Sequence, residues 1–160
     1  MKMNMIDYTG KINNHQEYIN ILDKIEIKCK YIEIVVIDGR KSNELIDEFS
    51  DDILNVRKVS KWWGTETKGS NYLYRIDYNK DIFEYLRKFE TFCKYYEYGS
   101  NKESLRRGDY SEITDFGLDD IAFYDKNDIC LLCTTTHEGH VYINEKIIIN
   151  KGNNISYENK

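Results

Sequence analysis

The chain has 160 residues, the usual size of one domain, and 41% of them are hydrophobic, which is enough for a core and too many for a disordered protein. The net charge of −5 disfavours nucleic acid as a partner, because contacts to phosphates favour a basic domain. No apolar run has the length of a membrane span and the amino terminus lacks a signal peptide's apolar stretch, so we expect a cytoplasmic protein with free thiols and no membrane partner.

Three segments have the periodicity of amphipathic helices, in which apolar residues recur three and four positions apart. The first is 14–25, where Asn14 can cap the helix and Glu17 follows three residues later, as in a capping box. The second is 42–55 and the third is 79–96. The third has the clearest apolar stripe, formed by Ile82, Leu86, Phe89, Cys93 and Tyr96.

Strands are expected between and after these helices, where β-branched and aromatic residues gather. Residues 30–37 predict a central strand, while 56–63 and 71–78 predict a hairpin around the polar loop 64–70. The last part of the chain predicts a β-meander with strands at 120–125, 128–136 and 140–149. The sequence therefore predicts an α+β fold, in which about three helices pack on a mostly antiparallel sheet.

The domain organisation is expected to be simple. Residues 1–150 form a single α+β domain in this interpretation, with a polar connector at 99–112. Residues 151–160 are polar and are expected to form a flexible C-terminal tail. Nothing in the sequence specifies the oligomeric state.

The stretch CLLCTTTHEGH, residues 130–140, contains two cysteines and two histidines. In zinc sites a CxxC motif usually lies in a tight turn that brings both thiolates to one point, and about a dozen residues separate it from the histidines. Here CLLC lies inside a predicted strand, so we expect Cys130 and Cys133 to point to opposite faces, with at least one of them buried. We therefore predict no shared zinc ion, no metal site and no cofactor.

Negative charge is concentrated between residues 109 and 128, which include seven acids and one lysine. Such a segment on a nearly neutral body can select a basic partner, although a solvated loop has the same composition. We expect these acids to be exposed and to form a docking surface that includes Asp109, Glu112, Asp115, Asp119 and Asp120. Reversing the charge of the last two residues should then slow association and leave the fold intact.

Trp62 and Trp63 lie beside Lys58, Lys61 and Lys68. Aromatic rings among basic residues can stack single-stranded bases, so a nucleic-acid binder is an alternative function. Adjacent residues of a strand face opposite sides, so one tryptophan should belong to the core and the other should be free to bind a partner. Packing alone also explains the pair.

His137 and His140 flank a predicted turn and should be exposed. Because histidine titrates near neutral pH, these residues and Glu138 form the alternative site of a hydrolase-type enzyme. His137 is also a candidate partner-binding residue. No nucleophile motif and no phosphate-binding glycine loop occurs, so no catalytic residue is predicted.

Four segments, VSKWWGT (59–65), FETFCKYY (89–96), DFGLDDIAFYD (115–125) and TTTHEG (134–139), resemble a set of small uncharacterised proteins from low-GC Gram-positive bacteria. Some of those proteins carry the label stage III sporulation protein AH, which denotes a membrane-anchored protein, and this chain has no predicted anchor. Others are similar in size to immunity proteins that neutralise polymorphic toxins. The resemblance implies an immunity or antitoxin-like module that binds a basic toxin domain, and it transfers no active-site residues.

Overall fold

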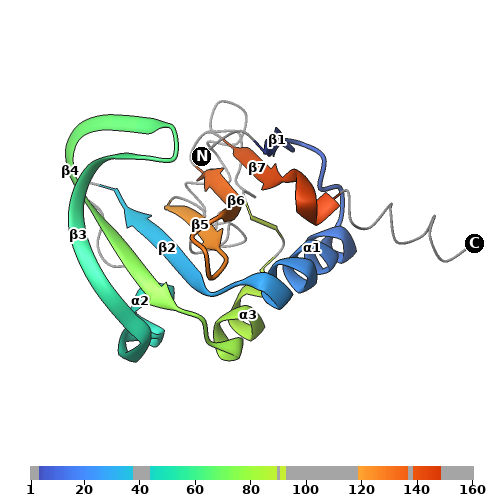
Figure 1. Cartoon of the computed structure of the whole chain (residues 1–160), viewed down its shortest axis with the longest axis horizontal. Coiled ribbons are helices and arrows are strands. Elements are labelled where there is room, and N and C mark those ends of the chain that lie inside the picture. Colours follow the sequence, from blue (N-terminus) through green and yellow to red (C-terminus); the bar gives the residue numbers. More distant parts are fainter. Residues whose placement is uncertain (1–3, 38–43, 90, 93–118, 137–138, 149–160) are drawn as a thin grey trace, which may run out of the picture.

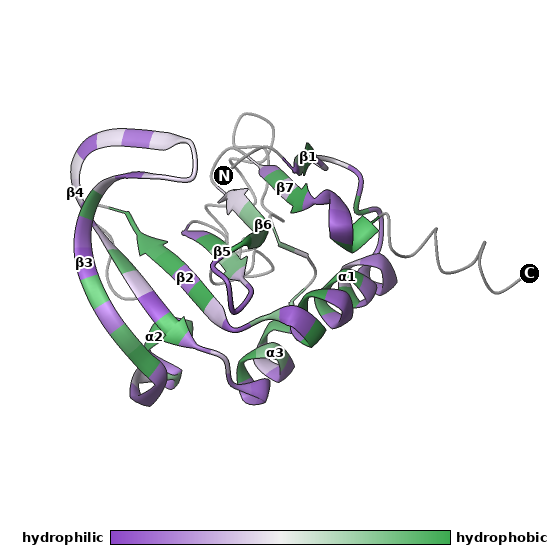
Figure 2. Ribbon diagram, viewed as in Figure 1, coloured by the Kyte–Doolittle hydropathy of each residue, from purple (hydrophilic) through white to green (hydrophobic). Residues whose placement is uncertain are grey.

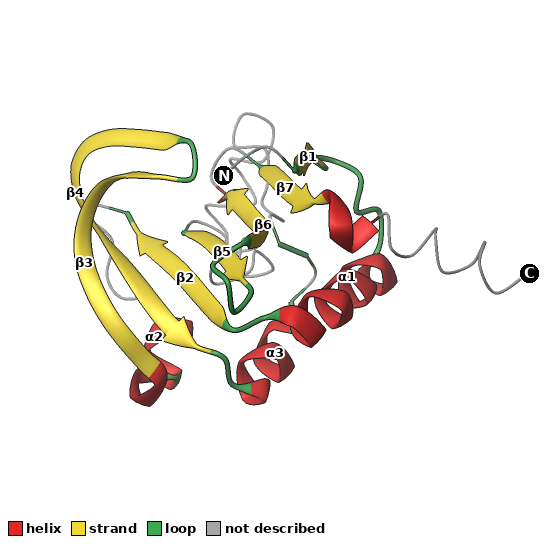
Figure 3. Ribbon diagram, in the orientation of Figure 1, coloured by secondary structure: helices red, strands yellow, loops and turns green. Residues whose placement is uncertain are grey.

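The computed structural model describes residues 4–37, 44–89, 91–92, 119–136 and 139–148. These residues form a seven-stranded antiparallel sheet with helices on one face, so the predicted α+β class is confirmed (Figures 1 and 3). In chain order the elements are β1 (Met5–Asp7), α1 (His15–Lys28), β2 (Tyr31–Val36), α2 (Glu44–Glu48), η1 (Ser50–Asp52), β3 (Ile53–Trp62), β4 (Thr65–Asp77), α3 (Lys80–Leu86), β5 (Asp120–Tyr124), β6 (Cys130–Thr135) and β7 (His140–Asn144).

The strands lie in the order β1-β7-β6-β5-β2-β4-β3. Strand β2 is inside the sheet, where Ile34 pairs with Tyr74 of β4 and with Ile121 of β5. The predicted C-terminal meander is present as β5, β6 and β7. Strand β1 was not predicted, because its three residues are too few to show a period. It pairs with β7 and forms one end of the sheet.

Alternation along β2 divides the protein into two sides. Ile32, Ile34 and Val36 belong to the main core, which lies between the sheet and the helices. Glu33 and Val35 belong to the opposite face, which also carries buried groups. We call it the helix-free face, because none of the described helices packs on it. Strand β2 is mostly hydrophobic in colour, the lower part of β3 alternates between hydrophobic and hydrophilic, and the arch of the β3–β4 hairpin is pale or hydrophilic (Figure 2).

Helix α1 begins as its sequence predicts. The Asn14 side chain accepts a hydrogen bond from the Glu17 amide at 2.9 Å, and the Glu17 carboxylate accepts one from the Asn13 amide at 2.8 Å. These bonds satisfy backbone donors that a helix start leaves without partners. The helix buries one apolar stripe against the sheet, formed by Tyr18, Ile21, Leu22 and Ile25.

Helix α3 is shorter than the predicted helix 79–96. Ile82 and Leu86 are fully buried as expected, and Phe89 packs against the same core. The Tyr18 hydroxyl donates to the Leu86 carbonyl oxygen, which joins α1 to the end of α3. Cys93 and Tyr96 lie outside the described residues.

Two predicted elements have the wrong extent. Helix α2 ends at Glu48, and Ile53 begins β3 because it pairs with Ile76 of β4 instead of continuing the predicted helix to residue 55. At the other end, β7 stops at Asn144, whose side chain accepts a hydrogen bond from the Lys146 amide at 2.9 Å. This contact caps a short helical turn at 145–148, where a strand was predicted.

The predicted hairpin exists, but its turn lies elsewhere. Residues 64–70 were predicted to be a loop, whereas Thr65 already begins β4 and pairs with Trp62. The turn consists of Trp63 and Gly64, with φ values of 20° and 102°. Two-residue hairpin turns favour positive φ because it matches the twist of the strands. The result is a longer hairpin than predicted, whose tip curls back toward the middle of the sheet (Figure 1).

Leu86→Ala should lower the free energy of unfolding by about 2–5 kcal/mol, because truncating a fully buried leucine removes apolar burial and leaves a cavity. Urea unfolding of the purified protein measures this loss. Ile27→Ala is the matched control, since Ile27 is 83% exposed and its truncation should change stability by no more than about 0.5 kcal/mol. Equal effects of the two variants would contradict the assignment of Leu86 to the core.

Candidate functional site

The tip of the β3–β4 hairpin is attached to the middle of the sheet by its two tryptophans. Trp62 Nε1 donates a hydrogen bond to Asp120 Oδ2 on β5 at 2.7 Å, and Trp63 Nε1 donates one to the Thr134 carbonyl oxygen on β6 at 2.8 Å. Strands β2 and β4 separate β3 from β5 in the sheet, so the hairpin must bend over the helix-free face to make these contacts. Figure 1 shows this arch turning back toward β6.

Asp120 is fully buried beneath the arch. Its Oδ2 atom accepts the Trp62 indole, and its Oδ1 atom accepts the Thr136 amide at 2.8 Å. Burying a carboxylate is costly unless it is hydrogen-bonded, and here both oxygens have donors. Asp119 is also fully buried. The prediction that Asp119 and Asp120 are exposed docking residues is therefore wrong, and reversing their charge should unfold the protein instead of leaving the fold intact.

The two tryptophans have different environments, because Trp62 ends β3 and Trp63 begins the turn. Trp62 is only 4% exposed and packs with Val35 and Leu73, so the expectation that one of the pair belongs to the core is confirmed. Trp63 is half-buried and contacts both the Val35 cluster and the cluster around Cys133. A part of Trp63 thus remains accessible at the tip of the hairpin.

A charged network crosses the helix-free face. Arg75 of β4 forms ion pairs with Glu33 of β2 at 2.8 Å and with Asp128, and its guanidinium lies 4.0 Å from the centre of the Tyr31 ring. Glu33 is 4% exposed, and loss of Arg75 would leave its buried charge uncompensated and destabilise the protein. Asp128, one of the acids of the 109–128 segment, is thus a structural residue that pairs with Arg75. The network therefore holds β2 and β4 to the turn before β6.

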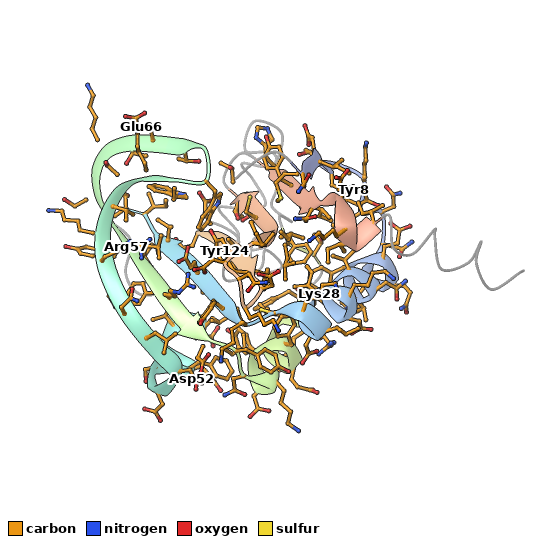
Figure 4. The ribbon with its side chains drawn as sticks, viewed as in Figure 1. Tyr8, Lys28, Asp52, Arg57, Glu66 and Tyr124 are labelled. Carbon is orange, nitrogen blue, oxygen red and sulfur yellow. The ribbon has the colours of Figure 1, made fainter. Side chains whose placement is uncertain are left out.

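A cavity of about 580 Å³ opens on the same face, between the hairpin tip and strands β1, β6 and β7. Ligand sites commonly have volumes of ~300–1,000 Å³, so this cavity is large enough for a side chain or a small molecule. In Figure 4 Glu66 lies on the arch of the hairpin. The residues that give the cavity its chemistry are Asp7, Trp63, Glu66, Cys133, His140 and Tyr142.

The cavity has an acidic character. The Thr9 hydroxyl and amide donate to the Asp7 carboxylate and lower its pKa, and the charges of His140 and Lys11 lower it further. Asp7 is therefore ionised at neutral pH. Glu66 adds a second, exposed carboxylate, and Lys61 is its partner across the hairpin.

Cys130 and Cys133 lie on one face of β6, so the prediction that they point apart is wrong. A register shift separates the pairs Phe123–Leu132 and Tyr124–Cys130, which leaves Leu131 as an extra residue in the strand. Such a bulge resets the alternation of side chains. The expectation that at least one thiol is buried is confirmed, since both cysteines are 3% exposed and pack with Ala122.

Several predicted site residues lie outside the described residues. These are Asp109, Glu112, Asp115, His137 and Glu138. His140 is half-buried at the cavity, where its ring lies 6.2 Å from that of Tyr142. Asp7 and Glu66 were missed, because one lies in a very short strand and the other in a segment with loop composition.

Comparison with known proteins gives no assignment for this chain. It matches no protein-family model, and neither curated proteins nor solved structures yielded a match. Within the described ranges, no helix has the length and apolar character of a membrane span. The same part of the chain has no group of three or more histidine, cysteine, aspartate or glutamate side chains placed to hold a metal ion.

Asp120→Ala should lower the free energy of unfolding by about 3 kcal/mol or more, because two buried donors lose their acceptor at once. Asp120→Asn should cost less, since its amide oxygen still accepts one of the two hydrogen bonds. Urea unfolding checks both values, with the exposed Glu48→Ala as control. A loss for Asp120→Ala no larger than that of the control would contradict the role of Asp120 in holding the hairpin.

Proposed function

We propose that this protein is a protein-binding module, and that it docks a basic partner by receiving a cationic side chain in the cavity under the hairpin tip. The observation that supports this proposal is the pair of carboxylates, Asp7 and Glu66, at a cavity that Trp63 and Tyr142 also line. Carboxylates and aromatic rings are the groups that attract an arginine or lysine head group.

Arginine fits this cavity better than lysine. A guanidinium can pair with a carboxylate through two parallel hydrogen bonds and can stack on an aromatic ring at the same time. The same protein already contains this arrangement, since Arg75 pairs with Glu33 and stacks on Tyr31. A partner's arginine between Asp7 or Glu66 and the Trp63 ring would repeat it with an external side chain.

An immunity or antitoxin-like role is the biological setting we propose, with a basic toxin domain as the partner. The acids Asp109, Glu112 and Asp115 remain proposed contributors, because negative charge near a binding site raises the association rate with a basic partner. His137 remains a proposed contact for its nearness in sequence to His140, which lines the cavity. A cytoplasmic location belongs to the same proposal.

The alternative functions have less support. Stacking of a base on Trp62 needs a ring that is accessible, and Trp62 is buried against Asp120. The carboxylates of Asp7 and Glu66 would also repel phosphates at the Trp63 side of the hairpin. The hydrolase-type alternative rests on His137, Glu138 and His140, of which the structure describes only His140. The sequence offers no nucleophile motif to act with it.

A short peptide that contains arginine should perturb the Trp63 indole N–H signal in an NMR titration, and the same peptide with citrulline should not. Citrulline has nearly the same shape as arginine and no charge, so the difference measures the cation. Asp7→Asn and Glu66→Gln should each weaken the response, whereas Lys61→Met should strengthen it by removing a competing cation across from Glu66.

Glu48→Gln is the matched control for these variants, because Glu48 is an exposed acid on α2 and does not line the cavity. Equal responses to the arginine and citrulline peptides would contradict the proposed docking mode.

Co-expression tests the immunity role separately. Cells that carry a candidate toxin encoded next to this protein should survive when the protein is present and die when it is absent. The Asp7→Asn, Glu66→Gln double variant should protect less than the native protein. Equal death with and without the protein would exclude immunity against that toxin while leaving the peptide measurement as the test of the docking mode.

A further inference from the structure

Three sulfur-containing side chains belong to one cluster beside the cavity. Cys130 and Cys133 form a buried cluster with Ala122, and Met5 of β1 packs against that cluster. The two thiols lie on the same face of β6. Met5 and Cys133 also line the cavity, so an ion that enters it can reach the cluster.

This grouping depends on two structural details. The bulge at Leu131 turns both thiols to the helix-free face, while Leu131 and Leu132 pack into the core on the other side. Met5 reaches the thiols because β1 pairs with β7, which in turn pairs with β6. Two thiols of β6 and a thioether of β1 therefore belong to one cluster across the intervening strand β7, although Met5 is far from both cysteines in the sequence.

We propose that Cys130, Cys133 and Met5 form a binding site for Cu(I). Thiolate and thioether sulfurs are the soft ligands that select this ion, and Cu(I) is stable with two or three of them. Zinc suits the site less well, because structural zinc is almost always bound by four ligands in a tetrahedron. Hard cations such as Mg²⁺ prefer oxygen ligands.

Metal binding at this site must be balanced by the release of protons. Binding of one Cu(I) by both cysteines displaces two thiol protons and forms two Cu–S bonds, with no change in oxidation state. Because protons compete with the metal for both sulfurs, Cu(I) affinity should fall as the pH falls.

The test is an anaerobic titration of the reduced full-length protein with Cu(I) in the presence of a chromophoric Cu(I) chelator. The native chain should withdraw a single Cu(I) ion from the chelator and gain sulfur-to-copper absorption in the near ultraviolet. Cys130→Ala and Cys133→Ala should each lose that ion, and Met5→Leu should bind it more weakly. Circular dichroism establishes that each variant remains folded.

Cys29→Ala is the matched control, because Cys29 lies in the main core and away from the sulfur cluster. It should bind Cu(I) as the native chain does. Ag(I), which is not oxidised by air, should compete for the same site. The proposal is overturned if the native chain leaves all Cu(I) with the chelator, or if folded Cys133→Ala retains the ion as well as the native chain.

Discussion

The buried carboxylate of Asp120 constrains the whole helix-free face. It has no exposure to solvent and accepts one hydrogen bond from the Trp62 indole and one from the Thr136 amide. A buried charge is tolerated only while it is hydrogen-bonded, and lifting the hairpin would remove the Trp62 donor from one carboxylate oxygen. The position of the arch follows from this requirement, and the cavity follows from the arch.

The two faces of the sheet differ in the kind of contacts they carry. The helix face holds the main core, where α1 and α3 bury their apolar stripes. The helix-free face combines buried polar contacts, such as the pairing of Arg75 with Glu33, with the cavity beneath Trp63. Polar groups fixed in place by such contacts are suited to recognition, because a partner then meets a site that is already ordered. Both proposals therefore concern this face.

Local patterns predicted the local structure well and the site poorly. The cap at Asn14 is a short-range signal, and the helix begins there as predicted. The three C-terminal strands also formed in the predicted order, although β7 ends at Asn144 and not at residue 149. The turn at Trp63–Gly64 was missed because the following segment has the composition of a loop. The bulge at Leu131 has no marker in the sequence, and it alone reversed the predicted directions of the two thiols. The cavity depends on pairings between distant segments, which periodicity does not encode.

Hydrogen exchange of the two indole N–H groups, followed by NMR, tests the anchored hairpin most directly. The account predicts that the Trp62 indole exchanges as slowly as the most protected amides of β2, because its hydrogen bond to Asp120 opens only when the protein unfolds. The half-buried Trp63 indole should exchange faster. If the Trp62 indole exchanged at the rate of free tryptophan while the β2 amides stayed protected, the hairpin would not be anchored, and the cavity would not be a feature of the folded protein.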